Sequence, residues 1–475
     1  MNFDEYRKLD GVALSSLIAR REVTAAEVLE TAIGRAEQVN PAINAVVWQQ
    51  YDQARANVSG RLTAGPFAGV PFLIKDLSIY EKGVPASLGS RLYADFVPDH
   101  DSAYTARCKR AGLVIMGRSL SPEFGLSPST EPVRFGPCRN PWNLDYSSGG
   151  SSGGAAAAVS AGILPFAHGT DGGGSIRTPA AHCGLFGLKP SRGRISFAPD
   201  AGEGWGGLAC GHVISRSVRD SAVMLACTSG LEPGDPYAAP TPARPFAEAV
   251  GQTPRRLRIA MMRKDHRGIA LHPECATAVD NAAKLCQSLG HIVEEAAPDI
   301  DLNALRPQSQ ILLCANVART LGLRWKTLKR QPNPTDVEAL TWSVYNRGLK
   351  ITGAEYVEAL AATHAAGRKL AAFLATYDVI LTSTVAAPPP KLGYFDTNGD
   401  IAVFRTRVTD YLSITPLYNA TGTPAMTVPL HWTADGLPVG VHFGARYGEE
   451  ATLLQLAAQL EQAQPWFDRV PPLRT

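Results

Sequence analysis

The stretch Gly149-Gly-Ser-Ser-Gly-Gly154, followed by Gly172-Gly-Gly-Ser-Ile-Arg177, says most about how this chain folds and what it does. Both segments combine serine with glycines, and the residues between them, 155–166, are almost all apolar. An apolar run of this kind predicts a helix followed by a strand inside a core. The two serine loops are then expected to meet at one end of that core, as in a serine acyl-transfer site.

A flexible Gly/Ser linker would have the same composition as the first loop. That loop, however, runs directly into an alanine-rich segment, so its amides are expected to begin a helix. A linker would also not need a second glycine loop that ends in serine. We therefore favour a structured site over a linker.

Lys75 ends the apolar stretch Val70-Pro-Phe-Leu-Ile-Lys-Asp76. Burial disfavours a charged amine, so the pKa of such a lysine falls and the neutral amine can accept a proton. The alternative is a structural lysine held in its charged form by Asp76. His168 and His182 are expected to be structural, because neither lies in a motif that pairs it with a carboxylate and a serine.

Taken together, Lys75 and the two serine loops resemble the amidase signature hydrolases. The likeness covers nearly the whole chain and continues through residues 179–181, 184–190, 377–381 and 419–424. It implies that Ser175 attacks the substrate, Ser151 relays the proton, and Lys75 is the ultimate base and then the acid. It also implies a cis peptide bond between Gly150 and Ser151.

The rest of the second loop is expected to support this chemistry. The backbone amides of Gly172, Gly173, Gly174 and Ser175 are the candidates for an oxyanion hole, since missing side chains allow close approach to a carbonyl oxygen.

Three further side chains are expected to hold the two loops in place. Asp171 and Arg177 flank the nucleophile loop and could pair across it. Ser152 either belongs to the same hydrogen-bond network or caps the following helix.

Composition narrows the class of protein. The 475 residues carry a formal charge of +3, so no basic surface argues for nucleic acid. The eight cysteines show no Cys-x-x-Cys spacing. The charged N-terminus lacks an apolar signal core, and no run of 18 apolar residues indicates a membrane span. We expect a cytoplasmic enzyme, a monomer or homodimer, with a small-molecule amide or carbamate as substrate, without metal or cofactor, and without nucleic-acid or membrane partners.

Alternating β-rich and helical segments predict an α/β protein. The resemblance implies the amidase signature fold, a single compact domain with a central mixed β-sheet covered by helices on both faces. We divide residues 1–475 into N-terminal helices (1–65), a catalytic core (about 66–200), a variable substrate-side region (about 200–376) and a C-terminal return to the core (377–475).

Local signals place several elements along the chain. Thr24 and Glu27 form a candidate capping box. Short strands are expected at 292–295 and 379–381, and the segment 425–460 is expected to form a strand, a turn at Asp435-Gly436, a second strand and a helix.

Within the family, the chain resembles the 6-aminohexanoate cyclic dimer hydrolases, the nylon-oligomer amidases, through residues 66–71, 130–132 and 139–144. Leu126 stands where those enzymes carry a polar residue. Cys314 falls where they place a cysteine near the substrate, although it could equally be a buried helix residue.

We expect Leu126, Trp205 and Cys314 to line an uncharged, fairly apolar pocket, while Trp325, Trp342 and Tyr345 could belong to it or simply pack in a core. The expected activity is cleavage of amides, with carbamates and esters as further substrates. Two alternatives stay open: the glutaminase subunit of a tRNA-dependent amidotransferase, and a non-catalytic binding protein on the same fold.

Overall fold

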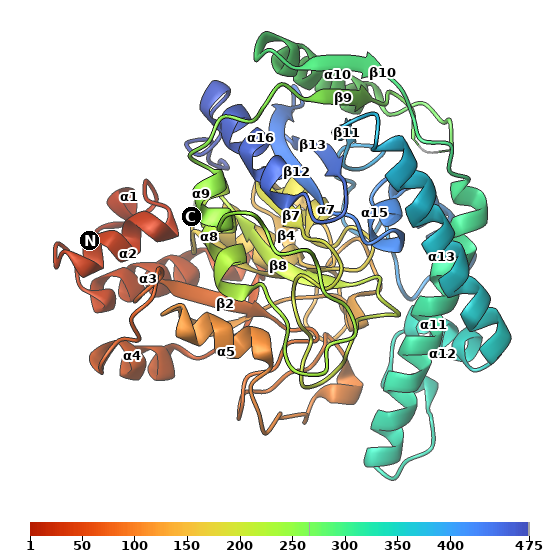
Figure 1. Ribbon diagram of the computed structural model, residues 1–475. Coiled ribbons are helices and arrows are strands. Elements are labelled where there is room, and N and C mark those ends of the chain that lie inside the picture. Colours follow the sequence, from red (N-terminus) through yellow and green to blue (C-terminus); the bar gives the residue numbers. More distant parts are fainter. Residues whose placement is uncertain (266, 474–475) are drawn as a thin grey trace.

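The computed structural model describes residues 1–265 and 267–473. Its centre is a mixed sheet of eight strands in the order β10-β9-β11-β13-β12-β7-β8-β6, which forms one α/β domain with helices on both faces (Figure 1). The strands of this sheet are β6 (Phe166–Asp171), β7 (Phe186–Lys189), β8 (Cys210–Ser215), β9 (Arg258–Met261), β10 (Ile292–Glu295), β11 (Val379–Ser383), β12 (Ala425–Trp432) and β13 (Pro438–Ala445). The fold class predicted from the sequence is thus confirmed.

The strand directions explain why the sheet is mixed. β10, β9 and β11 pair in parallel, whereas β11, β13, β12, β7, β8 and β6 pair antiparallel in turn. Side chains alternate between the two faces, as strand geometry requires. In β11, for example, Val379 and Leu381 pack into one hydrophobic cluster and Ile380 into another.

Helices cover the two faces of the sheet. On one face lie α8, α10 and α16; on the other lie α7 and α15, with α13 packed against α15. The helix bounds are α1 (Phe3–Tyr6), α2 (Gly11–Ala19), α3 (Ala25–Ile43), α4 (Tyr51–Ser59), α5 (Ala103–Arg110), α6 (Gly153–Ser160), α7 (Arg177–His182), α8 (Val218–Thr228), α9 (Phe246–Ala249), α10 (Pro273–Ser288), α11 (Leu302–Thr327), α12 (Ala339–Gly348), α13 (Gly353–Phe373), α14 (Ile401–Tyr411), α15 (Pro416–Ala420) and α16 (Glu450–Ala463).

A smaller sheet carries Lys75. It has the order β1-β3-β2, with bounds β1 (Val46–Gln49), β2 (Pro71–Lys75) and β3 (Val114–Ser119). β2 is buried at every position and packs against β6 of the large sheet. The smaller sheet therefore delivers Lys75 to the end of β6, where the second glycine loop begins.

The long helices α11, α12 and α13 stand beside one another at the edge of the molecule opposite the N-terminal helices (Figure 1). α11 packs on both α12 and α13. This is the segment predicted to cover the substrate side of the core.

Several local predictions are confirmed. Thr24 caps α3 in a capping box with Glu27, and residues 425–460 form β12, a turn with Gly436 at φ +82°, β13 and α16. The apolar run after the first serine loop forms α6, but the strand β6 begins only at Phe166, the last residue of that run. Throughout residues 1–265 and 267–473, no helix is long and apolar enough to cross a membrane.

Candidate active site

Lys75 is completely buried and is surrounded by hydroxyl groups. Its Nζ lies 2.7 Å from Ser151 Oγ, 2.9 Å from Ser152 Oγ and 2.8 Å from Thr170 Oγ1. Burial lowers the pKa of Lys75 well below its usual value, while the negative charge of Asp171 opposes this shift. The neutral amine can donate two of these hydrogen bonds and accept the third, so the arrangement suits a proton acceptor.

Asp76 does not hold the Lys75 ammonium. Its carboxylate accepts hydrogen bonds from the Ser87 amide at 2.9 Å and the Ser87 hydroxyl at 2.5 Å. Among the described residues, no carboxylate oxygen lies within 4.0 Å of Lys75 Nζ. The alternative of a lysine kept charged by its sequence neighbour is therefore wrong.

The first serine loop turns into α6 with both serines buried. The Gly150–Ser151 peptide bond is cis, as the family resemblance implies. Ser152 stands at the N-cap of α6 but its side chain makes no capping hydrogen bond there. Its hydroxyl instead contacts Lys75 and the backbone of Thr170, which places Ser152 in the Lys75 network.

The second serine loop is organised around the buried carboxylate of Asp171. Arg177 donates to both of its oxygens at 2.9 Å, and Asn419 Nδ2 donates to it at the same distance. Burial would raise the pKa of Asp171, but the charge and hydrogen bonds of Arg177 hold it well below the usual range. A permanently ionised Asp171 thus joins the start of the loop to its end.

The backbone amides of the second serine loop differ in whether they already donate a hydrogen bond within the protein. The Gly174 amide donates to Asp171 Oδ1 at 2.7 Å, so it is not available to a substrate. The amides of Gly172, Gly173 and Ser175 meet no hydrogen-bond acceptor within the described part of the chain. They are the remaining candidates for an oxyanion hole, and Gly174 is left out of it.

Gly174 serves the loop through its conformation. It has φ +130°, and a Cβ there would stand 2.4 Å from Thr415 Oγ1. Thr415 itself donates to the carbonyl of Gly173 at 2.7 Å. The loop therefore needs glycine at this position in order to pack against the residues that precede α15.

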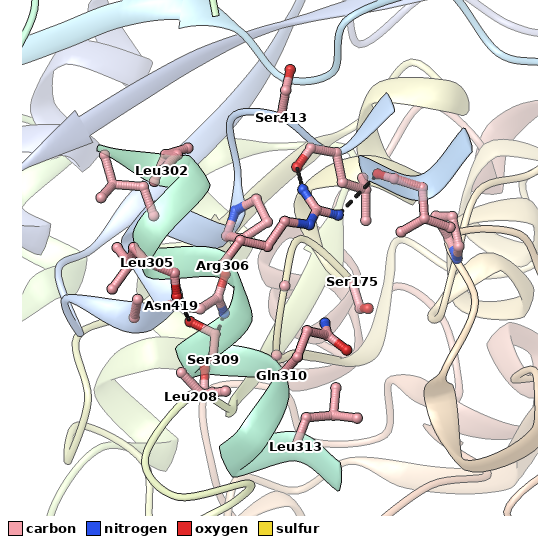
Figure 2. A pocket seen from close by; sticks show the side chains of 18 of the residues that line it. Ser175, Leu208, Leu302, Leu305, Arg306, Ser309, Gln310, Leu313, Ser413 and Asn419 are labelled. Atoms are coloured by element: carbon pink, nitrogen blue, oxygen red, sulfur yellow. Dashed lines mark hydrogen bonds between the residues drawn. The ribbon is translucent and has the colours of Figure 1, made fainter. Parts of the chain in front are cut away.

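A cavity opens over this loop. Ser175, Gly172 and Gly173 form part of its lining, and Figure 2 shows the Ser175 hydroxyl facing into it. That hydroxyl makes no hydrogen bond to any described residue. Ser175 is therefore open to a substrate, while Ser151 and Lys75 lie buried behind it.

Two of the three pocket residues expected from the sequence line this cavity. Leu126 and Trp205 both contribute to its wall. The Trp205 ring lies so close to the nucleophile loop that a Cβ on Gly172 would stand 2.7 Å from it.

The expectation that Cys314 lines the pocket is wrong. Cys314 does not belong to the cavity lining but is buried between α11 and α12, where a Cβ on Gly348 would stand 2.2 Å from its carbonyl oxygen. The helix turns its neighbour Leu313 toward the cavity instead. In the same way, Trp325, Trp342 and Tyr345 pack on one another in a hydrophobic cluster rather than on the cavity.

The expectation of an uncharged pocket is also wrong. Arg267 and Arg306 both line the cavity, together with polar side chains of α11. Arg267 pairs with Asp265 and Asp410, at 2.8 and 2.9 Å. The remainder of the wall is mainly apolar and includes the leucines 126, 208, 302, 305, 313, 412 and 417.

The two histidines near the site have structural partners. His182 lies 2.6 Å from the Tyr411 hydroxyl, and His168 Nδ1 accepts the backbone amide of Lys75 at 3.3 Å. Burial lowers the pKa of both imidazoles, so both are neutral at physiological pH. Neither contacts Ser151 or Ser175 through a hydrogen bond.

Sequence reasoning missed three residues that hold the site together: Thr170, Thr415 and Asn419. Thr170 lies two residues before the second glycine loop, and its hydroxyl could have been considered as a third partner of Lys75. Asn419 opens another quoted motif, but only the fold shows that it reaches Asp171, Arg177 and the carbonyl of Leu208.

Comparison with known proteins finds amidases that match this chain over nearly its full length. The family described as "Amidase" matches residues 27–454. The 6-aminohexanoate-cyclic-dimer hydrolase of Paenarthrobacter ureafaciens is 38% identical over 98% of this chain and 96% of its own.

Solved structures agree in fold. A structure of 6-aminohexanoate cyclic dimer hydrolase superposes with a TM-score of 0.94 at 35% identity, covering 98% of this chain and 99% of the other. A bacterial aryl acylamidase of the amidase signature family superposes with a TM-score of 0.89 at 26% identity, with the same coverage.

Proposed function

The chain belongs to the amidase family and is a hydrolase that acts on amides, and from this premise we propose that it cleaves them through an acyl-enzyme on Ser175 with Ser151 and Lys75 as the proton path. The observation that carries the proposal is the fully buried Lys75 amine, 2.7 Å from the hydroxyl of Ser151 and free of any carboxylate partner among the described residues. Serine is too weak an acid to attack unaided, and this amine is the base in reach.

In the proposed first step, Ser175 Oγ attacks the amide carbonyl and gives its proton to Ser151, which passes its own to Lys75. The amides of Gly172, Gly173 and Ser175, which have no acceptor among the described residues, are the proposed donors to the oxygen that becomes negative. Removal of one such donor typically raises the barrier by about 3 to 4 kcal/mol.

In the second half, the Lys75 ammonium returns the proton through Ser151 to the departing amine. Water then hydrolyses the acyl-enzyme along the same path, with Lys75 again as base. Burial disfavours the charged form of Lys75 and lowers its pKa, which favours the neutral amine that acts as the base at the start of the cycle.

The cavity suggests the kind of substrate. Its leucine-rich wall and Trp205 suit an apolar acyl or amine group. A urethane presents the same carbonyl to the same donors, so we extend the proposal to carbamates and to esters.

The test is mass spectrometry after treatment with a serine-reactive fluorophosphonate. We expect the label on Ser175, and Ser175→Ala to lower kcat/KM for hexanoyl p-nitroanilide by roughly four orders of magnitude or more. Ser160→Ala, on α6 outside the cavity, is the matched control and should keep wild-type activity. A label on another serine, or an active Ser175→Ala variant, would show that the nucleophile is wrongly assigned.

A further inference from the structure

Two polar side chains on α11 interrupt the apolar wall of the cavity. Arg306 and Gln310 are four residues apart, so they occupy the same face of the helix as Leu302, Leu305 and Leu313. A wall that needed only to bind an apolar group would have no use for them.

Arg306 lacks a counter-ion. Its guanidinium donates to three backbone carbonyls at the end of α14, with Nη1 3.3 Å from Thr409 O and 3.2 Å from Leu412 O, and Nη2 3.1 Å from Val408 O. No carboxylate of the described residues lies within 4.0 Å of it, in contrast to Arg267.

Its surroundings leave this charge only partly compensated. Burial, followed by the positive charge of Arg267, lowers the pKa of Arg306 to about 10, whereas Asp410 opposes the shift. Arg306 thus stays charged at neutral pH. Half-buried charges without a counter-ion are uncommon in proteins, because desolvation is costly.

The side-chain amide of Gln310 has no hydrogen-bond partner among the described residues. Figure 2 shows its amide extending from α11 into the cavity, toward the side on which Ser175 lies, with Arg306 one turn back along the helix. A half-buried amide that is unpaired in a binding cavity is available to a ligand.

We propose that Arg306 and Gln310 form a specificity subsite that binds a second oxygen acceptor of the substrate, a carboxylate or carbonyl remote from the bond that is cleaved. Both side chains offer N–H donors, and Arg306 adds a positive charge without a counter-ion, so an oxygen acceptor suits them and a purely apolar chain does not. This proposal rests on the proposed function, because it assumes that the reacting carbonyl lies at Ser175. Ser175 lines the same cavity as Arg306 and Gln310.

Binding to the inactive Ser175→Ala variant tests the subsite without any turnover. Three ligands differ only at the end remote from one amide: hexanamide ends in a methyl group, adipamide in a second amide, and adipamic acid in a carboxylate. We expect adipamic acid and adipamide to bind at least about tenfold more tightly than hexanamide, and the stronger of the two identifies the acceptor as charged or neutral.

Substitutions then assign the effect to residues. Arg306→Met and Gln310→Leu, each in the Ser175→Ala background, should reduce this preference about tenfold or more while hexanamide binding changes less than about threefold. Arg306→Lys should keep part of the preference for the carboxylate, since it keeps the charge. The matched controls on the same helix are Arg319→Met, which removes an exposed arginine, and Gln308→Leu, which lies outside the cavity lining.

The outcomes separate the two proposals. Equal binding of all three ligands, or equal losses for all three in the Arg306 and Gln310 variants, would overturn the subsite and leave these residues with a structural role at the end of α14. Failure of the fluorophosphonate to label Ser175 would overturn the nucleophile assignment alone, because the ligand preference is measured without it.

Discussion

At the scale of single residues, Lys75 shows how burial changes the chemistry of a side chain. A lysine in water is charged and cannot accept a proton. Here the amine is fully enclosed among the hydroxyls of Ser151, Ser152 and Thr170, and none of these carries a charge that would stabilise the ammonium. The same surroundings that make the charged form costly make the neutral form a base.

This predicts the pH dependence of the reaction. Protonation of Lys75 removes the base, so kcat/KM should fall about tenfold per pH unit below the apparent pKa, and burial places that acid limb well below the usual lysine value of 10.5. Lys75→Arg, which stays protonated, should be inactive across the whole pH range.

A pH–rate profile of hexanoyl p-nitroanilide hydrolysis checks this. His182→Asn serves as the control and should show the same acid limb, because His182 contacts Tyr411 and the Ser147 carbonyl but not Ser151 or Ser175. The assignment of Lys75 as the base would be contradicted if His182→Asn no longer lost activity at low pH while Lys75→Arg remained active.

At the scale of elements, the cavity lies between a loop and a helix that the core holds apart. The loop before β8 carries Trp205, which has φ +52° and packs against Gly172 of the nucleophile loop. α11 supplies the opposite wall. α11 also packs on α12, so some of its side chains face the cavity and others face α12. Two neighbouring residues of the helix can differ in this way: Leu313 lines the cavity, whereas Cys314 packs against α12.

Trp205→Ala and Leu126→Asn should therefore change substrate choice. We expect each to shift the ratio of kcat/KM between anilides and aliphatic amides by about 1 to 3 kcal/mol, because each removes apolar contact with the bound group. Kinetics on paired substrates measure this ratio.

Cys314→Ala is the contrasting variant. It should cost roughly 1 kcal/mol of unfolding free energy through a small cavity between α11 and α12, and leave the substrate ratio unchanged. A changed ratio in Cys314→Ala, or an unchanged one in both wall variants, would mean that the walls are placed wrongly.

At the scale of the whole molecule, a pair of buried acids connects the catalytic core to the helices of the substrate side. Glu123, next to the cavity residues Gly125 and Leu126, accepts the backbone amide of Glu338 at 2.7 Å and the Ser90 hydroxyl at 2.6 Å. Glu338 stands at the N-cap of α12. Burial and the charge of Glu338 raise the pKa of Glu123 to about 7.

This pair predicts a pH-dependent stability. An acid whose pKa is higher in the folded state stabilises the fold below its unfolded value, near 4.5, and this contribution is lost as the pH rises through about 7. The free energy of unfolding should therefore carry a component that decreases between those pH values.

Urea denaturation at several pH values measures it. Glu123→Gln, which keeps a neutral group of the same shape, should flatten this decrease, whereas Glu358→Gln on the exposed face of α13 should not. If both variants retained the wild-type slope, the buried pair would not be its source.

Much of the fold and part of the site follow from the sequence alone, because the signals are local. The Thr24 capping box, the turn at Asp435-Gly436 and the strand at 292–295 are each encoded within a few residues, and the structure has all of them. The two serine loops and the apolar strand that ends in Lys75 could also be predicted from the sequence, because each is a local pattern of residue types.

The rest was decided by tertiary structure. Asn419 lies about 250 residues from Asp171, and no local pattern connects them before the sheet is folded. The face that a helix presents likewise depends on what packs beside it, so Cys314 is buried against α12 while Arg306, on the same helix, faces the cavity. Chemical identity and local conformation are properties of neighbouring residues, whereas charge compensation, burial and the walls of a cavity depend on contacts between residues far apart in the chain, which form only when the whole molecule packs.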